Sequence, residues 1–153
     1  MTPNDLEGAG RLLFGEGWKR PLADLVGVNE RSVNRWARGE SPIPDGVAAE
    51  VVAAIVEKIA NNIEAVLRAQ KMPSKIAIAI YKSDRDIAAV TGDGWRAAFH
   101  RELMLSVSKN LARRGIEAEL RSIDPDAFFN WLKQNGKKNS PATRAAFAAD
   151  NIG

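Results

Sequence analysis

The sequence of 153 residues contains no cysteine and only one histidine, His100. The lack of cysteine excludes a disulfide framework, a thiolate metal site and a cysteine nucleophile. A single histidine excludes a metal site built from several histidines of one chain. We therefore expect no metal and no cofactor. This inventory fits a protein that only docks on other molecules and is not an enzyme.

Long hydrophobic runs are also missing, because charged residues interrupt every apolar stretch well short of the ~18 residues that a membrane span needs. The N-terminal residues 1–5 are polar and acidic, and this predicts no signal peptide. Hydrophobic residues make up 45% of the chain and charged residues 27%, which is typical of a folded protein. The expectation is a soluble, cytoplasmic protein with no membrane partner.

The sequence is rich in helix signals, since 24 of its residues are alanine and capping residues precede prolines at Thr2, Ser41, Asp124 and Ser140. Glycines suited to left-handed helix ends follow several of the runs. We predict helices over residues 3–14, 19–26, 30–38, 44–70, 95–114, 126–135 and 141–149. In the first helix the predicted apolar face is Leu6, Ala9, Leu12 and Leu13, and in the long helix it is Val52, Ile55, Ile59, Ile63 and Val66.

Two strands are predicted in the C-terminal half. Ile76, Ile78 and Ile80 alternate with alanines whose small size suggests that both faces of the strand are covered, and a second strand is expected over 116–123. A turn at 91–94 and a long helix separate them, so the strands should be parallel. Because two strands make a poor sheet, either the sheet continues across a dimer or residues 82–92 form a third strand. The predicted fold is mainly α with a small α/β part, divided into domains 1–70 and 71–153.

The most informative stretch runs from residue 18 to residue 44 and is predicted to fold as helix, tight turn, helix. Its residue types meet the packing requirements of that arrangement. Leu22, with Leu25 or Val26, should pack inward, as should Val33 and Trp36. Ala23 is small where the second helix crosses, Gly27 suits the turn, Val28 fills the gap and Asn29 can cap the second helix.

This stretch resembles the Cro/repressor-type (XRE-like) helix-turn-helix transcriptional regulators. Leu22-Ala23, Gly27-Val28-Asn29, Val33, Trp36 and Gly39 carry the resemblance, which covers residues 5–56. Lys19 stands where that family usually has glutamine, and Asn29 where it often has serine or threonine. The resemblance implies a second helix that lies in the major groove of double-stranded DNA.

The outer face of that helix supplies the predicted DNA contacts. Candidates for base contacts are Glu30, Arg31, Ser32, Asn34 and Arg35, because such side chains can recognise base edges through hydrogen bonds. Lys19, Arg20, Asn29 and Arg38 are candidates for phosphate contacts, which position a protein without reading sequence.

The net charge of +3 is informative only when it is divided. Residues 1–72 contain 9 Lys+Arg and 10 Asp+Glu, whereas residues 18–38 contain five and two, a local net charge of +3. So small a basic surface predicts that one monomer binds DNA with modest, salt-dependent affinity. We therefore expect a homodimer that binds a palindromic DNA site.

The C-terminal half leaves three interpretations open. The first is a dimerisation module that uses the apolar residues Ile76, Ile78, Ile80, Trp95, Phe99 and Leu103. The second is a sensor or partner-binding domain, such as the half of an antitoxin that binds its partner protein. The third is an enzyme with Asp84, Asp86, His100 and Glu102 as candidates, although residues 82–86 are more typical of a solvated loop and His100 of a surface position.

The order of elements, with Gly94-Trp95-Arg96 opening a helix, is also similar to some anti-CRISPR-associated autorepressors of phages. That similarity implies a phage or mobile-element protein that represses its own operon. The sequence therefore predicts a dimeric transcriptional repressor that binds an inverted repeat, with an antitoxin-type interaction protein as the alternative.

Overall fold

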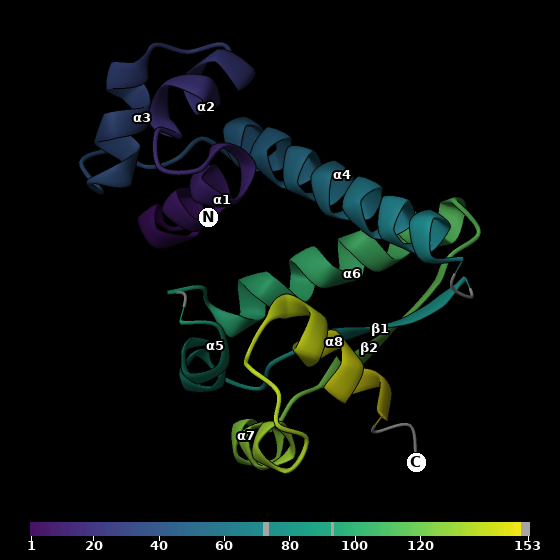
Figure 1. The fold of residues 1–153 in the computed structure, drawn as a ribbon. Helices are drawn as coiled ribbons and strands as arrows, with labels where there is room; N and C mark the ends of the chain where they lie inside the picture. The colour runs from purple at the N-terminus through teal and green to yellow at the C-terminus, as the bar shows by residue number, and fades with distance from the viewer. Residues whose placement is uncertain (72–73, 93, 151–153) are drawn as a thin grey trace. The chain divides into compact units, whose positions relative to one another are not determined.

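The computed structural model describes residues 1–71, 74–92 and 94–150, and these residues are mainly helical (Figure 1). Residues 72, 73 and 93, which belong to the predicted domain junction and turn, lie outside the described residues. The elements, in chain order, are α1 (Pro3–Phe14), α2 (Lys19–Leu25), α3 (Glu30–Ala37), α4 (Asp45–Gln70), β1 (Lys75–Ile80), α5 (Asp84–Thr91), α6 (Ala97–Arg113), β2 (Glu117–Ser122), α7 (Pro125–Gln134) and α8 (Pro141–Asp150). None of the helices in this part of the chain is long and apolar enough to cross a bilayer.

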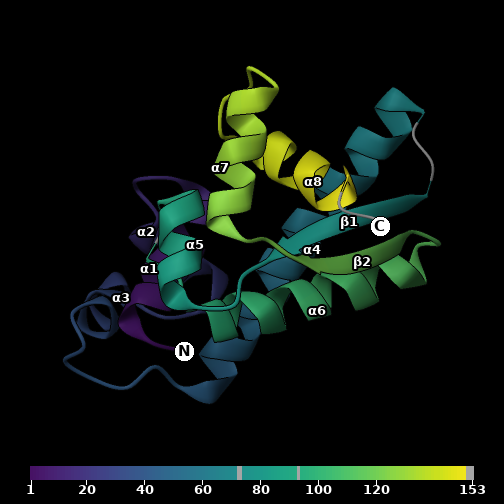
Figure 2. The same ribbon diagram turned by 90° about the horizontal axis from the view of Figure 1, so that it is seen from below.

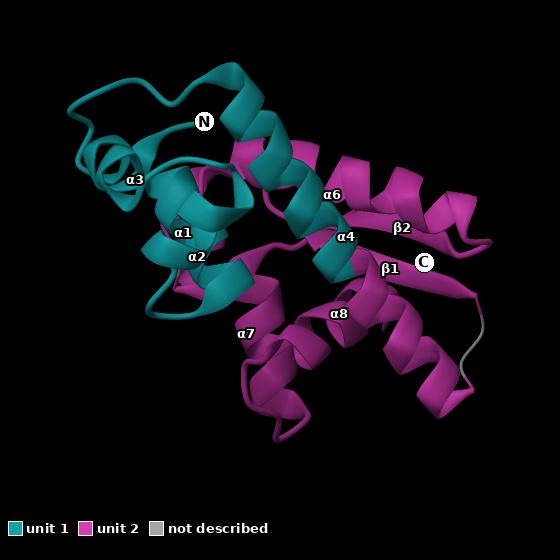
Figure 3. Cartoon of the chain, turned by 90° about the horizontal axis from the view of Figure 1, so that it is seen from above, with its two compact units in different colours: residues 1–59 teal, residues 60–153 magenta. Residues whose placement is uncertain are grey.

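The chain forms two compact units, residues 1–59 and 60–153 (Figure 3). The division falls inside α4, so this helix contributes its first turns to one unit and its last turns to the other. The sequence predicted a boundary at the end of the same helix. A continuous helix carries no proline or glycine at a domain junction, and the sequence therefore gives no sign of the position.

Thr2 begins the first unit by capping α1. Its hydroxyl accepts from the backbone N–H of Asp5, and the Asp5 carboxylate accepts from the backbone N–H of Thr2 at 2.8 Å. This reciprocal pair satisfies two helix N–H groups, which explains how Asp5 can be fully buried. At the other end of α1, Lys58 of α4 donates to the carbonyl of Leu13 at 2.6 Å. Both ends of the helix are thus fixed by polar contacts within the unit.

Two of the predicted apolar faces are partly wrong. On α1, Leu6 and Ala9 are buried as expected, but Leu12 is 41% exposed. On α4 the buried residues are Val51, Ile55, Val56, Ala60 and Leu67, whereas Val66 is 51% exposed. The buried stripe of α4 passes through Ala60, which a search for large apolar side chains overlooks, and it therefore runs to one side of the predicted stripe.

The second unit is built on a parallel pair, β1 and β2, in the register Lys75 to Glu117 through Ile80 to Ser122. The predicted parallel arrangement is confirmed, but the suggestion of a third strand within 82–92 is wrong, because most of that segment is helix α5. Ser83 caps α5 by accepting from Asp86 N–H, and Gly92 ends it with a φ of 75°. These local signals form a helix, although the need of a two-stranded sheet for a further strand had suggested one here.

Helices cover both faces of this sheet, with α6 on one side and α8 on the other (Figures 1 and 2). Ala79 and Tyr81 face a buried cluster that includes Phe128 of α7 and Phe147 of α8. Ile76, Ile78 and Ile80 alternate with them and face α6. The alanines of β1 let α8 approach closely, which confirms the prediction that both faces are covered.

One helical glycine in the first unit is required for close packing. A Cβ added to Gly10 of α1 would lie 2.2 Å from Cε3 of Trp18, whose side chain is 3% exposed. The indole therefore occupies the space that the side chain of any other residue at position 10 would need. A glycine in the interior of a predicted helix is the sequence feature that indicates such close packing.

We predict that Gly10→Ala destabilises the protein by about 1–3 kcal/mol, because the indole must move to admit a methyl group. Thermal unfolding followed by circular dichroism measures the effect. Gly46→Ala is the matched control, since Gly46 is also helical and its Cβ would meet nothing within 4 Å. Equal melting temperatures for the two variants would contradict this account of Gly10.

Candidate nucleic-acid interface

Helices α2 and α3 are joined by a tight turn whose backbone is fully organised. Gly27 adopts a φ of 65°, a left-handed conformation that a residue with a Cβ adopts only with strain. The backbone N–H of Val28 donates to the carbonyl of Ala23 at 2.9 Å and closes the turn. Asn29 then caps α3, as predicted, because its side-chain Oδ1 accepts from the backbone N–H of Ser32 at 2.9 Å.

The inner faces of the two helices pack as the sequence predicted, with one exception. Leu22 and Val33 are fully buried, and Ala23 and Trp36 are 2% and 7% exposed. Leu25, however, is 43% exposed, so it does not pack inward. Val26, the other candidate for that place, is half-buried. At about 100° of rotation per residue, Leu25 lies about 110° around α2 from the mean direction of Leu22 and Ala23, whereas Val26 lies within about 10° of it. The helix therefore points Leu25 away from the core.

Three arginines form a stripe along the outside of α3. Arg31, Arg35 and Arg38 recur at intervals of four and three residues, and all three are exposed. At about 100° of rotation per residue they fall within an arc of about 60°, centred about 160° from the mean direction of Val33 and Trp36. We call Arg31, Arg35 and Arg38 the arginine stripe. Burial of Val33 and Trp36 on one side of α3 therefore directs the stripe outward on the other.

The members of the stripe differ in how they are held. Arg38 forms an ion pair with Glu40 at 3.5 Å. No hydrogen bond or ion pair holds the guanidinium of Arg31 or of Arg35 among the described residues. These two guanidinium groups, each with five N–H donors in a planar fork, are the available bidentate donors on this face.

The remaining candidates for base contacts flank the stripe. Glu30 is exposed in the first turn of α3, and Asn34 donates its side-chain N–H to the Glu30 carbonyl at 3.1 Å. Ser32 is half-buried, and its hydroxyl donates to Asn29 Oδ1 at 3.2 Å. Asn34 and Ser32 are therefore engaged within their own helix, unlike Arg31 and Arg35.

The candidates for phosphate contacts lie at the beginning of α2 and around α3. Arg20 is exposed, whereas Lys19 is half-buried with its Nζ 6.0 Å from the ring centroid of Trp18. Asn29 uses its amide oxygen as the helix cap, which leaves the amide N–H groups to donate. No sequence motif predicted a role for Trp18 or Glu40, but Trp18 lies beside Lys19 and Glu40 pairs with Arg38. Their sequence positions, one and two residues from these cations, could have indicated both contacts.

The residues predicted to form a dimer interface lie in the second unit and are not equally accessible. Ile78 and Leu103 are 8% and 2% exposed within one copy of the chain. Ile76, Ile80, Trp95 and Phe99 are half-buried, and the rings of Trp95 and Phe99 stack with centroids 5.6 Å apart. Ile78 and Leu103 therefore already contribute to the packing of α6 on β1 within one copy.

The residues considered for an enzyme do not sit in a solvated loop. Asp84 and Asp86 lie in the first turn of α5, and the Asp84 carboxylate accepts from the backbone N–H of Ala97 at 2.7 Å, at the beginning of α6. The solvated-loop interpretation of 82–86 is wrong because Ser83 initiates a helix there. Glu102 is exposed on α6.

His100 also differs from its predicted surface position. Its ring centroid lies 5.3 Å from that of Tyr81, and its Nδ1 is buried with no hydrogen-bond partner in the part of the chain that the structure describes. Burial, with the nearby charge of Arg144, lowers the pKa of His100 to about 4. The imidazole is therefore neutral at pH 7 and serves as part of the packing around Tyr81.

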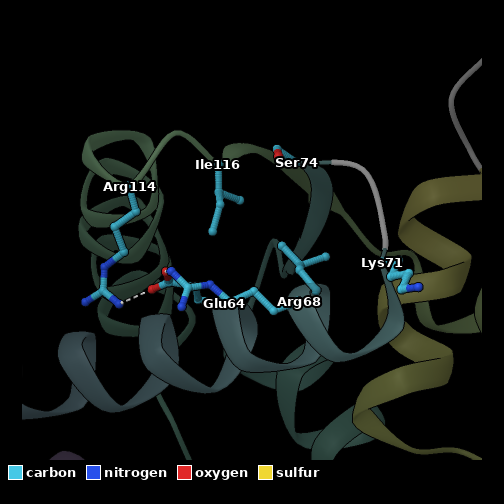
Figure 4. A pocket seen from close by; sticks show the side chains of 7 residues that line it. Glu64, Arg68, Lys71, Ser74, Arg114 and Ile116 are labelled. Carbon is cyan, nitrogen blue, oxygen red and sulfur yellow. Dashed lines mark hydrogen bonds and ion pairs between the residues drawn. The ribbon is translucent and has the colours of Figure 1, made fainter.

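A shallow hollow of about 320 Å³ lies between the last turns of α4, the end of α6 and the beginning of β1 (Figure 4). Arg114 and Arg68 both pair with the carboxylate of Glu64 there. Arg114 also donates to Asn61 and Asn110, at 2.7 and 2.8 Å. These contacts tie α4 to α6 within the second unit, and Glu64 compensates one of the three positive charges that Arg68, Lys71 and Arg114 bring to the hollow.

No family model matches this chain, and a search of curated proteins found no similar sequence.

The environment of His100 predicts a specific loss of stability in mild acid. Its pKa is about 4 in the folded protein and 6.5 for the free side chain, so the unfolded chain binds a proton first as the pH falls. Stability from this residue is complete above about pH 6.5 and decreases from there towards pH 4. Because His100 is the only histidine, the interval from about pH 6.5 to 5 isolates it from the carboxyl groups.

Thermal unfolding between pH 7 and 5 should show a melting temperature that decreases in the parent protein. His100→Gln, which cannot take up this proton, should lose most of that decrease. Identical pH profiles for the two proteins would show that His100 is not the titrating group.

Proposed function

We propose that the protein is a sequence-specific DNA-binding transcriptional regulator, a dimeric repressor of the Cro/repressor-type helix-turn-helix class that binds an inverted-repeat operator. The arginine stripe supports the proposal most strongly. Arg31, Arg35 and Arg38 lie on the side of α3 opposite its buried anchors, where a helix in the major groove meets the bases.

In this proposal α3 enters the major groove and α2 crosses the DNA backbone. Arg31 and Arg35 each bind the O6 and N7 acceptors of a guanine through two N–H groups. Glu30, Ser32 and Asn34 meet neighbouring base edges after Ser32 and Asn34 exchange their contacts within the helix. Lys19, Arg20, Asn29 and Arg38 bind phosphates and set the position of α3 along the groove.

A homodimer completes the proposal, because one copy offers little charge. Residues 18–38 carry a net charge of +3, and phosphate neutralisation supplies much of the affinity of DNA-binding proteins. Two copies double the number of phosphate contacts and read two half-sites. The proposed site is therefore an inverted repeat, such as one in the DNA upstream of the protein's own gene.

We predict that Arg31→Ala and Arg35→Ala each weaken specific binding by about 5- to 150-fold, the equivalent of about 1–3 kcal/mol per lost bidentate contact. The measurement is fluorescence anisotropy with a labelled duplex from upstream of the gene, against a scrambled duplex of equal length. If that segment shows no preference, a duplex selected from a random pool takes its place. Binding to the scrambled duplex should change much less.

Arg85→Ala is the matched control, because Arg85 is an exposed arginine on α5, in the other compact unit, and is not one of the proposed contact residues. Lys19→Ala and Arg20→Ala should behave differently from the base-contact variants, since they should weaken both duplexes and reduce the salt dependence of binding by about one counterion each. Unchanged specific affinity in both Arg31→Ala and Arg35→Ala would overturn the assignment of α3.

A further inference from the structure

Strand β2 has one edge that no strand pairs with in the described part of the chain. Its inner edge pairs with β1, where the backbone N–H of Glu117 donates to Ser74 and that of Ile123 donates to Ile80. In a parallel ladder with this register, the N–H and C=O groups of Ala118, Leu120 and Ser122 point to the opposite edge. Figure 2 shows β2 along the outside of the sheet, with β1 on its other side.

The surface beside this edge is apolar on the face that α6 covers. Leu120 is half-buried there, and Leu105 of α6 is 42% exposed. Ser108 lies one turn of α6 beyond Leu105, and its hydroxyl donates to the carbonyl of Ala118 at 3.0 Å. This contact places the Leu105 side of α6 next to the edge and occupies one of the two lone pairs of that carbonyl.

The charges on β2 are arranged so that the strand is complementary to itself. Glu119 and Arg121 stand on either side of Leu120, on the other face of the sheet. If two copies of β2 run antiparallel with Leu120 opposite Leu120, Glu119 of each copy faces Arg121 of the other. The same register joins Ala118 to Ser122 through the outward backbone groups and leaves no like charges opposed.

We propose that β2 pairs antiparallel with β2 of a second copy of the chain, about a two-fold axis at Leu120. The result is a four-stranded sheet in the order β1-β2-β2-β1, with Leu105 and Leu120 of both copies in contact beneath it. A two-stranded sheet is marginal by itself, and an open strand edge invites pairing. Pairing with a second copy enlarges the two-stranded sheet and covers the open edge of β2 at the same time.

The state of Arg121 in one copy supports this pairing. Its guanidinium is bound to Glu119 of its own strand at 2.7 Å, but its Nε is buried and has no hydrogen-bond partner within residues 1–71, 74–92 and 94–150. In the proposed register the Glu119 carboxylate of the second copy approaches Arg121 from across the strand. A change of the Arg121 rotamer would then bring its Nε–H to an acceptor, and an unsatisfied buried donor is costly.

The inference specifies the dimer that the proposed function requires, and it places the centre of the interface on β2, where the sequence had predicted β1 and the first half of α6. Its test contains no DNA, so a failure here is distinguishable from a failure of DNA binding. The full-length chain is used throughout.

The first experiment measures dimerisation of charge variants by sedimentation equilibrium. Arg121→Glu places glutamates at 119 and 121, and Glu119→Arg places arginines at both, so each variant alone should dimerise at least tenfold more weakly than the parent. An equimolar mixture of the two should recover dimers, because every cross-strand pair in the heterodimer joins opposite charges. An effect confined to one chain could not produce that recovery.

Lys82→Glu is the charge control, because Lys82 is exposed and outside both strands. It should leave the dimer intact. A monomeric parent protein at concentrations of tens of micromolar, or variants that do not recover dimers when they are mixed, would overturn the proposal.

The second experiment uses the absence of native cysteine. In the proposed register the two Leu120 Cα atoms lie about 5.5 Å apart, within the range of a disulfide, so Leu120→Cys should form a covalent dimer on mild oxidation. Ser122→Cys lies on the same edge, but its two copies would be about 13 Å apart, and it should cross-link far less. Equal cross-linking of the two variants would exclude this register.

Discussion

The burial of Val33 and Trp36 against α2 is the contact on which the proposed DNA-binding surface depends. Full burial of a large apolar side chain is worth about 1.5–3 kcal/mol, so two such anchors define the rotation of a helix of eight residues. That rotation fixes the direction of the arginine stripe. Ala23 is equally necessary, because a larger side chain there would separate α2 from α3.

Two features of the turn support this packing by defining where α3 begins. Gly27 takes a left-handed conformation just after the end of α2, and Asn29 caps α3. Only a few residues separate α2 from α3, so the position of α3 relative to α2 is fixed. A longer loop would allow that position to vary. Apolar burial thus sets the rotation of α3, and the turn sets its starting point.

Much of the architecture followed from the sequence because its signals are local. Capping residues before prolines and the alternation of isoleucine and alanine located the two strands and every described helix except α5 to within a few residues. The errors arose where a long-range contact decided the outcome. Leu25 is apolar but exposed because it lies off the face of α2 that Leu22 and Ala23 bury, and Ala60 lies in the buried stripe of α4 although Val66 is larger. His100 was predicted at the surface, but Tyr81, which is distant in sequence, packs against its ring.

The sequence by itself determined the order of the two strands and of the described helices other than α5, the parallel direction of the strands, and the group of residues from which DNA contacts are proposed. Those properties depend on neighbours in the chain and on the periods of 3.6 and two residues. Only the tertiary structure decided which guanidinium groups of α3 are unpaired among the described residues, that the Asp84 carboxylate accepts from the first N–H of α6, and that no described strand pairs with the outer edge of β2. Each of these depends on residues far apart in sequence that packing brings together, and no local pattern encodes their distances.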